Sequence, residues 1–282
     1  MSSVGNVLRD LAARLKKAGA RSSCLSSIEI MAHVLQIKRM DLYLAFDRKL
    51  SAAEKKQIDH LLSIRASGTP LEYVLGNVEF YDCRLRLTKD VLIPRPETEI
   101  LVDLIVRQLQ KEDLRGKKLW DIGCGSGCIG IAIKKKLPDL QVTLSDISER
   151  ALTLARENAQ LNGVEVSFCQ GDLLLPFSGE RADFLVSNPP YIPTGEYLTL
   201  GAEVKDFEPR LALEAGTDGL DYFRRLKEQM PAKLSSSAKI FFEMGYNQEP
   251  QLRALFDKAP WKRATAIKDW AGYFRFFLLE IE

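Results

Sequence analysis

Residues 117–137 read KKLWDIGCGSGCIGIAIKKKL, an apolar strand pattern, a glycine-rich turn and an apolar helix pattern in direct succession. Glycines at 123, 125 and 127 remove side chains where the backbone must turn tightly between strand and helix. Their spacing differs from the G-x-G-x-x-G of dinucleotide-binding proteins, and no Lys-Ser/Thr follows as in a phosphate-binding loop. The stretch therefore predicts a strand–turn–helix unit that approaches a ligand without a dedicated anion site.

The same alternation continues to the end of the chain. Apolar strand patterns are separated by helical patterns, the strands being expected at 141–147, 164–172, 182–188, 238–245 and 275–281. Strands joined by helices form a mostly parallel sheet with helices on both faces. The predicted fold class is therefore α/β and Rossmann-like, with a ligand bound outside the carboxyl ends of the strands.

The chain before this region has a different pattern. Residues 1–66 read as about four amphipathic helices, with Ser51 as an expected N-cap. From Val78 the sequence VEFYDCRLRLTKDVLI alternates and predicts a hairpin with its turn near Thr88–Asp90. The expected organisation is a helical domain at 1–75, a β-hairpin linker at 76–95 and a ligand-binding domain at 96–282.

Composition excludes several classes of function. With 46% hydrophobic and 28% charged residues the chain is an ordinary globular protein, and no apolar run is long enough to span a membrane. Five scattered cysteines and two histidines predict reduced thiols in a cytoplasm, with no disulfide framework and no metal site. The net charge is +2, but residues 1–75 carry +5. That excess suits an acidic or RNA-associated partner, and a solvated helical surface explains it equally well.

Acidic residues follow three neighbouring strands. Asp146 ends the strand after the glycine turn, where a carboxylate can accept both hydroxyls of a ribose. Asp172 and Leu173 end the next strand, where they can hold an exocyclic amine and cover a purine. Asp146 alone is equally explained as an exposed N-cap of the next helix, and Asp172 alone is weak evidence. Together with Asp121 before the turn, they describe a nucleoside pocket that suits S-adenosylmethionine, whose sulfonium is positive.

The fourth strand pattern ends in Asn188-Pro189-Pro190-Tyr191. Two prolines hold this corner extended and remove backbone donors. Methyl transfer to a planar amide or amino nitrogen is difficult, because its lone pair is delocalised. The side-chain oxygen of Asn188 and the carbonyl of Pro189 can accept hydrogen bonds from the two N–H groups of that nitrogen. They can also stabilise the positive charge that develops on it. The ring of Tyr191 would provide a face for the planar group.

DIGCGSG followed by NPPY resembles the class I methyltransferases that modify planar nitrogens. The segments TPLEYVLGNVEFY (69–81), VLIPRPETE (91–99) and FEPRLALEAGTDGLDYFRRL (207–226) resemble more narrowly the glutamine methyltransferases of peptide chain release factors (HemK/PrmC type). The resemblance spans 69–282, whereas 1–66 matches in architecture alone, as the domain that faces the factor.

The resemblance implies methyl transfer from S-adenosyl-L-methionine to the glutamine amide of a Gly-Gly-Gln motif, leaving S-adenosyl-L-homocysteine. It implies class I release factors as partners, a cytoplasmic location, and no membrane or nucleic-acid substrate. The catalytic residues would be Asn188 and Pro189, with Pro190 and Tyr191 also contacting substrate. The expected cofactor-binding residues are Gly123, Cys124, Gly125, Ser126, Gly127, Asp146, Asp172, Leu173 and Asn188.

Three other functions stay open on sequence grounds. They are a glutamine methyltransferase of a ribosomal protein, an adenine-amino methyltransferase of nucleic acid, and a nucleoside-binding protein without activity. The chain also departs from the family pattern at three places. Asp82 replaces a usual glycine, Leu173 a frequent aromatic residue, and Tyr273-Phe274 a more polar, basic pair. Because Asp tolerates a left-handed backbone, the hairpin is expected to form.

Overall fold

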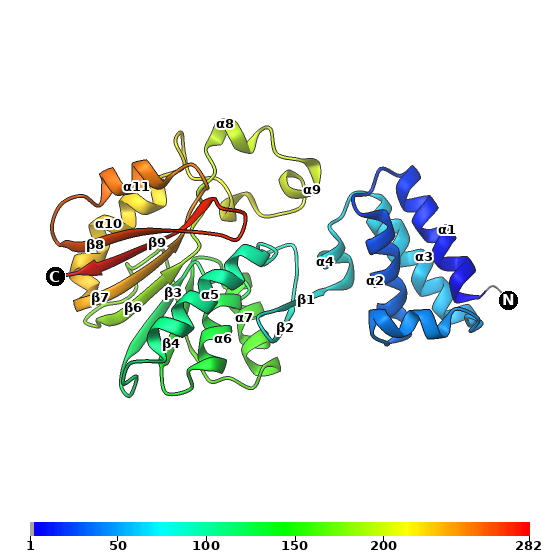
Figure 1. Cartoon of the computed structure of the whole chain (residues 1–282), viewed down its shortest axis with the longest axis horizontal. Helices are drawn as coiled ribbons and strands as arrows, with labels where there is room; N and C mark the ends of the chain where they lie inside the picture. The colour runs from blue at the N-terminus through cyan, green and yellow to red at the C-terminus, as the bar shows by residue number, and fades with distance from the viewer. Residues whose placement is uncertain (1–2) are drawn as a thin grey trace. The chain divides into compact units, whose positions relative to one another are not determined.

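The computed structural model describes residues 3–282 and divides them into two compact units. The first unit contains the chain up to Asn77 together with Gly201–Phe207, and the second contains Val78–Leu200 and Glu208–Glu282. The chain therefore enters the first unit twice, because a short segment from far along the sequence packs with the amino-terminal helices (Figure 1).

The first unit is helical. Its elements are α1 (Val4–Lys17), α2 (Ser23–Leu35), the 3-10 helix η1 (Arg39–Ala45), α3 (Ala52–Ala66), α4 (Leu71–Leu75) and α9 (Ala202–Lys205). The expected N-cap at Ser51 is confirmed: its hydroxyl accepts from the N–H of Glu54, whose carboxylate accepts from the N–H of Ser51. Apolar stripes from the helices form one core, with Leu11, Leu15 and Ile30 almost fully buried.

A two-stranded hairpin follows, formed by β1 (Asn77–Phe80) and β2 (Cys83–Arg86). Its turn is at Tyr81–Asp82, so the expected turn near Thr88–Asp90 is wrong. Both turn residues have positive φ, 43° and 61°, the geometry that two-residue hairpin loops favour because it matches strand twist. Asp82 thus adopts the left-handed backbone expected of it.

The second unit is built on a seven-stranded sheet of order β5-β4-β3-β6-β7-β9-β8 (Figure 1). The strands are β3 (Lys118–Ile122), β4 (Gln141–Asp146), β5 (Ser167–Gln170), β6 (Ala182–Ser187), β7 (Leu234–Glu243), β8 (Trp261–Lys268) and β9 (Phe274–Ile281). The first five in this order run parallel, whereas β9 pairs antiparallel with β7 and β8 antiparallel with β9. The order reverses at β3, which creates the crevice expected for a ligand.

Helices cover both faces of this sheet, as the α/β prediction requires. One face packs against α5 (Pro96–Leu109), α6 (Cys128–Lys136) and α7 (Glu149–Leu161); the other packs against α10 (Asp221–Lys233) and α11 (Glu249–Leu255). Adjacent residues of one strand point to opposite faces, so Leu119 lies in the first core and Trp120 in the second. The predicted fold class is confirmed.

The chain between β6 and α10, apart from Gly201–Phe207, completes the second unit near the carboxyl ends of the strands. The chain after β6 forms the short helix α8 (Thr194–Tyr197) and later the 3-10 helix η2 (Arg210–Ala212). Within residues 3–282 the structure contains no helix that is both long and apolar enough to cross a membrane.

Candidate functional site

A cavity of about 380 Å³ lies in the second unit at the carboxyl ends of β3, β4 and β6. Its lining contains most of the residues that the sequence singled out: Gly123, Cys124, Gly125, Ser126, Asp146, Asp172, Leu173, Asn188, Pro189 and Pro190. Gly127 and Tyr191 do not line it. The volume falls within the roughly 300–1,000 Å³ typical of small-molecule sites.

The glycine turn between β3 and α6 uses its own amides inside the protein. Gly123 and Gly125 have φ of 69° and 52°, which residues with a Cβ atom rarely adopt. The N–H groups of Gly123 and Cys124 donate to the carbonyl of Ser145 at 2.8 and 2.9 Å, and that of Gly125 donates to Asp146 at 2.9 Å. These three amides are therefore not available to a pyrophosphate.

The last glycine of the motif has a packing role. A Cβ atom at Gly127 would lie 2.8 Å from Cδ1 of Ile131 on α6 and 3.1 Å from Cδ1 of Leu144 on β4. One turn further, a Cβ atom at Gly130 would lie 2.2 Å from Leu144 on β4. The two glycines let α6 approach β4 closely, and this contact places the turn over the strand ends.

Asp146 points into the cavity from the end of β4. Its carboxylate accepts hydrogen bonds from the N–H groups of Gly125 and Ser148, both at 2.9 Å. Burial raises the pKa of Asp146, and the backbone donors at Ser148 and Gly125 oppose that shift. The two hydrogen bonds hold the side chain in one orientation at the edge of the cavity.

Asp121, the acid before the turn, lies in the interior, outside the lining of the cavity. It is 1% exposed, and one oxygen accepts from the N–H of Gly130 at 2.8 Å. Its other oxygen has no hydrogen-bond partner. Burial raises the pKa of Asp121 to about 7, and the negative charge of Asp146 acts in the same direction. Asp121 therefore stabilises the start of α6, just after the glycine turn, through its hydrogen bond from Gly130.

Asp172 is paired with a residue that the sequence analysis did not single out. Its carboxylate forms a close ion pair with Arg225 of α10, and both residues line the cavity. Tyr222, one turn earlier on the same helix, also lines the cavity, and its ring centroid is 5.8 Å from the guanidinium carbon of Arg225. The spacing of Tyr222 and Arg225 places both on one helix face, which is the sequence signal that could have found them.

The Asn-Pro-Pro-Tyr corner begins where β6 ends. Asn188, Pro189 and Pro190 line the cavity. Tyr191 turns away from it: its hydroxyl lies 3.4 Å from a carboxylate oxygen of Glu243, and its carbonyl accepts from the side chain of Gln248 at 2.9 Å. Its ring packs against the core beside α10 and α11, and the substrate contact expected of that ring stays a prediction.

The wall opposite these strand ends comes from the loop before α5. Val91, Leu92, Pro94 and Arg95 line the cavity. Arg95 forms an ion pair of 2.6 Å with Glu208, whose other oxygen accepts from the N–H of Ile93 at 3.3 Å. The proline-rich break PRPETE signals this loop, although its role as a wall depends on contacts with residues far along the chain.

The cysteines in the lining are not poised as nucleophiles. Burial raises the pKa of the Cys124 thiol and raises that of Cys128 to about 12, so both are neutral thiols at neutral pH. Among residues 3–282 no group of three or more His, Cys, Asp and Glu side chains is arranged to hold a metal ion. The polar groups of the lining are therefore carboxylate, carbonyl, amide and hydroxyl groups, together with Arg95 and Arg225, which are both held in ion pairs.

The sheet and the positions of these acceptors define a class I methyltransferase. The family model for the methyltransferase small domain matches residues 98–203, and the model for the PrmC N-terminal domain matches 6–76. A solved 16S rRNA methyltransferase (RsmC) from T. thermophilus, in complex with AdoMet and guanosine, is similar in fold. Its TM-score is 0.52 at 15% identity, over 73% of this chain and 50% of that one.

Curated relatives narrow the class. A release factor glutamine methyltransferase from Geobacter sulfurreducens is 36% identical over 86% of this chain and 84% of its own length. One from Chlamydia trachomatis serovar D is 38% identical over 97% and 93%. The chain belongs to the release factor glutamine methyltransferase family. The resemblance inferred from the motifs is confirmed, and the chain is a methyltransferase.

Proposed function

We propose that this chain methylates the side-chain amide nitrogen of a glutamine, the glutamine of the Gly-Gly-Gln motif of class I peptide chain release factors. One observation carries the proposal. Asn188 and Pro189, an amide oxygen and a carbonyl fixed by consecutive prolines, line the same cavity as Asp146 and the glycine turn. The relatives named for this activity match nearly the whole chain.

S-adenosylmethionine fits the residues that line the cavity. Asp146 would accept the ribose hydroxyls, Leu173 would cover the adenine, and the turn 123–126 would hold the amino-acid end. The amides of Gly123 and Gly125 are already bonded within the protein, which suits a cofactor without phosphate. Asp172 is paired with Arg225, so it would meet an exocyclic amine as part of an ion pair.

The residues of the chain hold the nitrogen that is methylated. Asn188 Oδ1 and the Pro189 carbonyl would accept hydrogen bonds from its two N–H groups. These bonds position the nitrogen and favour its loss of planarity. The bound S-adenosylmethionine supplies a methyl group on a positive sulfur: the N–C bond forms as the S–C bond breaks, S-adenosylhomocysteine is left, and the nitrogen releases one proton. The neighbouring prolines keep competing donors away from the two acceptors.

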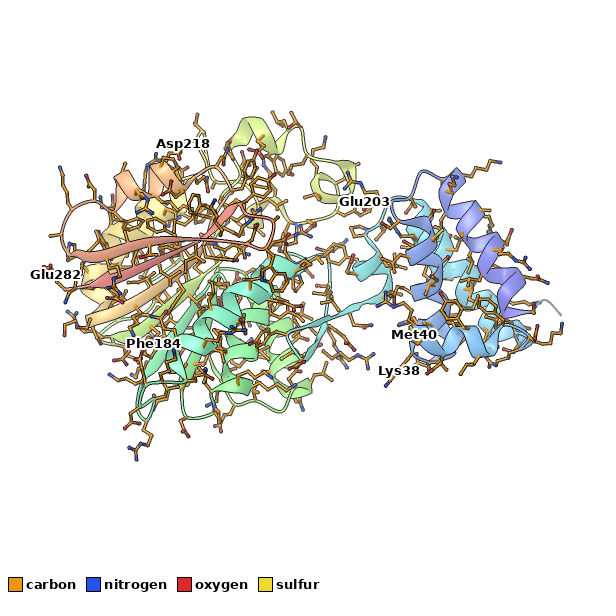
Figure 2. All side chains as sticks on the ribbon, viewed as in Figure 1. Lys38, Met40, Phe184, Glu203, Asp218 and Glu282 are labelled. Atoms are coloured by element: carbon orange, nitrogen blue, oxygen red, sulfur yellow. The ribbon has the colours of Figure 1, made fainter. Side chains whose placement is uncertain are left out.

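The domain at 1–75 would dock the factor, the hairpin at 76–95 would link it, and 96–282 would catalyse transfer. Exposed apolar side chains gather on η1 and support a docking surface, with Met40 at 74% and Leu44 at 89% exposed. Lys38 is also exposed there (Figure 2). Apolar and basic side chains at this surface would complement an apolar and acidic patch on a protein partner. A release-factor substrate implies a cytoplasmic enzyme.

The direct test is mass spectrometry of a purified release factor after incubation with the enzyme and methyl-labelled S-adenosylmethionine. The expected result is one labelled methyl group on the Gly-Gly-Gln glutamine. Label on a ribosomal protein alone, or on adenine of DNA or RNA alone, would overturn the substrate assignment.

Docking has a separate test. Leu44→Ser with Lys38→Glu should raise the KM for an intact factor several-fold and leave the affinity for S-adenosylmethionine unchanged, because neither residue lines the cavity. The matched control is Leu161→Ser, which changes a leucine 47% exposed on the second unit. An equal KM for the double variant and the control would refute docking through η1.

A further inference from the structure

A short series of hydrogen bonds runs from the cavity, which Asn188 and Thr98 both line, to the buried carboxylate of Glu243. Asn188 Nδ2 donates to the hydroxyl oxygen of Thr98 at 3.4 Å, and the Thr98 hydroxyl donates to Glu243 Oε2 at 2.6 Å. The three residues come from the end of β6, the first turn of α5 and the end of β7. Thr98 is 2% and Glu243 is 1% exposed, so the bond between these two residues is shielded from solvent.

The directions of these bonds follow from what each group can donate. An ionised carboxylate only accepts, so the single proton of the Thr98 hydroxyl is committed to Glu243. The Thr98 oxygen can then only accept, and the amide nitrogen of Asn188 is the group that turns to it. The opposite end of that amide, Oδ1, is left for the cavity that Asn188 lines.

We propose that Thr98 and Glu243 are positioning residues of the methyl-transfer site, which turn the oxygen of Asn188 toward the glutamine amide that is methylated. The inference rests on the proposed function and deepens it. A substrate N–H bond needs an acceptor, and an Asn188 amide turned the other way would present its own N–H groups instead. The hydrogen-bond relay formed by Glu243, Thr98 and Asn188 therefore determines whether the Asn188 side chain attracts or repels the substrate nitrogen.

The charge of Glu243 controls the direction of the relay. Burial raises the pKa of Glu243 to about 7. The groups facing it are Arg275 from β9, which lowers that pKa, Glu97 from α5, which raises it, the hydroxyl of Tyr191, and the neutral thiol of Cys128. Below this pH the protonated carboxyl can donate to Thr98, whose own proton can then turn to Asn188 and reverse its amide. The positioned state is the ionised one.

Variants at Thr98 test the relay. Thr98→Val keeps the shape but removes the hydroxyl, so kcat on the release factor should fall roughly tenfold to a hundredfold, the range expected when a reacting group is misplaced. Because Thr98 also lines the cavity, the dissociation constant for S-adenosylmethionine is measured for each variant and kcat is compared at saturating cofactor. Thr98→Ser retains the hydroxyl and should restore most of kcat, which a purely packing role of the threonine side chain would not predict.

Glu243→Gln tests the direction of the relay. A glutamine can either accept from or donate to Thr98, so it no longer forces one orientation of Asn188. The kcat of the unmodified enzyme should rise with pH through about 7, following Glu243, and this limb should be absent from Glu243→Gln. A persisting limb in the variant, or unchanged kcat in Thr98→Val, would overturn the inference.

Asn188→Ala separates this inference from the proposed function on which it rests. If Asn188→Ala and Thr98→Val both keep full kcat, the proposed site is wrong. If Asn188→Ala loses activity while a folded Thr98→Val does not, the site stands and only the positioning role is refuted. Affinity for S-adenosylmethionine and the midpoint of thermal unfolding report whether each variant is folded.

Discussion

The carboxylate of Asp146 accepts a hydrogen bond from the backbone N–H of Gly125 at 2.9 Å. This contact joins the end of β4 to the glycine turn after β3, and both residues line the cavity. The acid therefore closes the turn and also lines the cavity that we propose binds S-adenosylmethionine.

Replacing Asp146 should weaken the binding of S-adenosylmethionine. Asp146→Ala removes an acceptor for the ribose and the partner of Gly125, so affinity should fall by about 1.5–3 kcal/mol. Isothermal titration calorimetry measures this directly. Glu149→Ala is the matched control, because it removes an exposed acid just beyond the cavity on α7. Equal affinities for the two variants would refute the assignment of Asp146.

Asn188→Ala should affect turnover and leave cofactor affinity nearly intact. Removing one preorganised polar group from a transfer site typically lowers kcat by roughly a hundredfold or more. Single-turnover methylation of a release factor is the measurement. Asn247→Ala, an exposed asparagine outside the cavity, is the control and should behave as the unmodified enzyme. Near-normal turnover of Asn188→Ala would exclude the two-acceptor mechanism.

Asp121 should make stability depend on pH. Its pKa is raised from 3.8 to about 7 because the folded protein buries it. Below about pH 4 the carboxyl group is neutral in both the folded protein and the unfolded chain, so it does not lower the free energy of unfolding there. Between about pH 4 and 7 the unfolded chain ionises it while the folded protein does not, so the free energy of unfolding falls as pH rises.

The loss through Asp121 is on the order of a few kcal/mol, since each unit of pKa shift corresponds to about 1.4 kcal/mol. Urea unfolding at pH 5 and pH 8 without cofactor, compared with Asp121→Asn, isolates it because the other acids are common to both proteins. The variant should gain stability relative to the unmodified enzyme as pH rises. A constant difference between the two proteins would contradict the buried, neutral form of Asp121.

Glu203 should stabilise the helical unit although it lies far along the chain. Its carboxylate forms an ion pair of 2.8 Å with Arg65, whose side chain is 3% exposed. Arg65 also donates to the carbonyls of Thr69 and Arg21, at 2.9 and 3.0 Å. Glu203→Gln would leave this buried guanidinium with neutral partners only, at a cost of about 1.5–3 kcal/mol in stability.

Limited proteolysis within Gly201–Phe207 and the urea midpoint measure the effect of Glu203→Gln. Glu196→Gln, an exposed acid on α8, is the control. Because Glu203 needs Arg65, a truncation of the amino-terminal helices would disturb the segment after β6, so point variants are the cleaner probe. If Glu203→Gln and Glu196→Gln are equally stable, the ion pair does not secure the segment.

The elements with strong local patterns were predictable. The strand–turn–helix at 117–137, the capping box at Ser51 and the left-handed turn residue Asp82 follow from periodicity, capping chemistry and backbone preference. β8 was missed because its alternation is weak: it is the edge strand of the sheet, and most of its side chains are exposed or partly exposed. The hairpin turn was misplaced because the polar run at Thr88–Asp90 gives a stronger turn signal than a tyrosine does.

The sequence by itself determined the α/β fold, the glycine turn, the Asn-Pro-Pro corner and the family, because these depend on short-range periodicity and contiguous motifs. Only the tertiary structure decided three contacts: Asp172 pairs with Arg225, the hydroxyl of Tyr191 lies beside Glu243, and Thr98 accepts a hydrogen bond from Asn188. The physical reason is that a strand's period of two places a side chain on a face of the sheet, whereas its hydrogen-bond partner comes from another element. Asn188 and Thr98 are 90 positions apart in the sequence, and only the packing of α5 on the sheet brings them within hydrogen-bond distance.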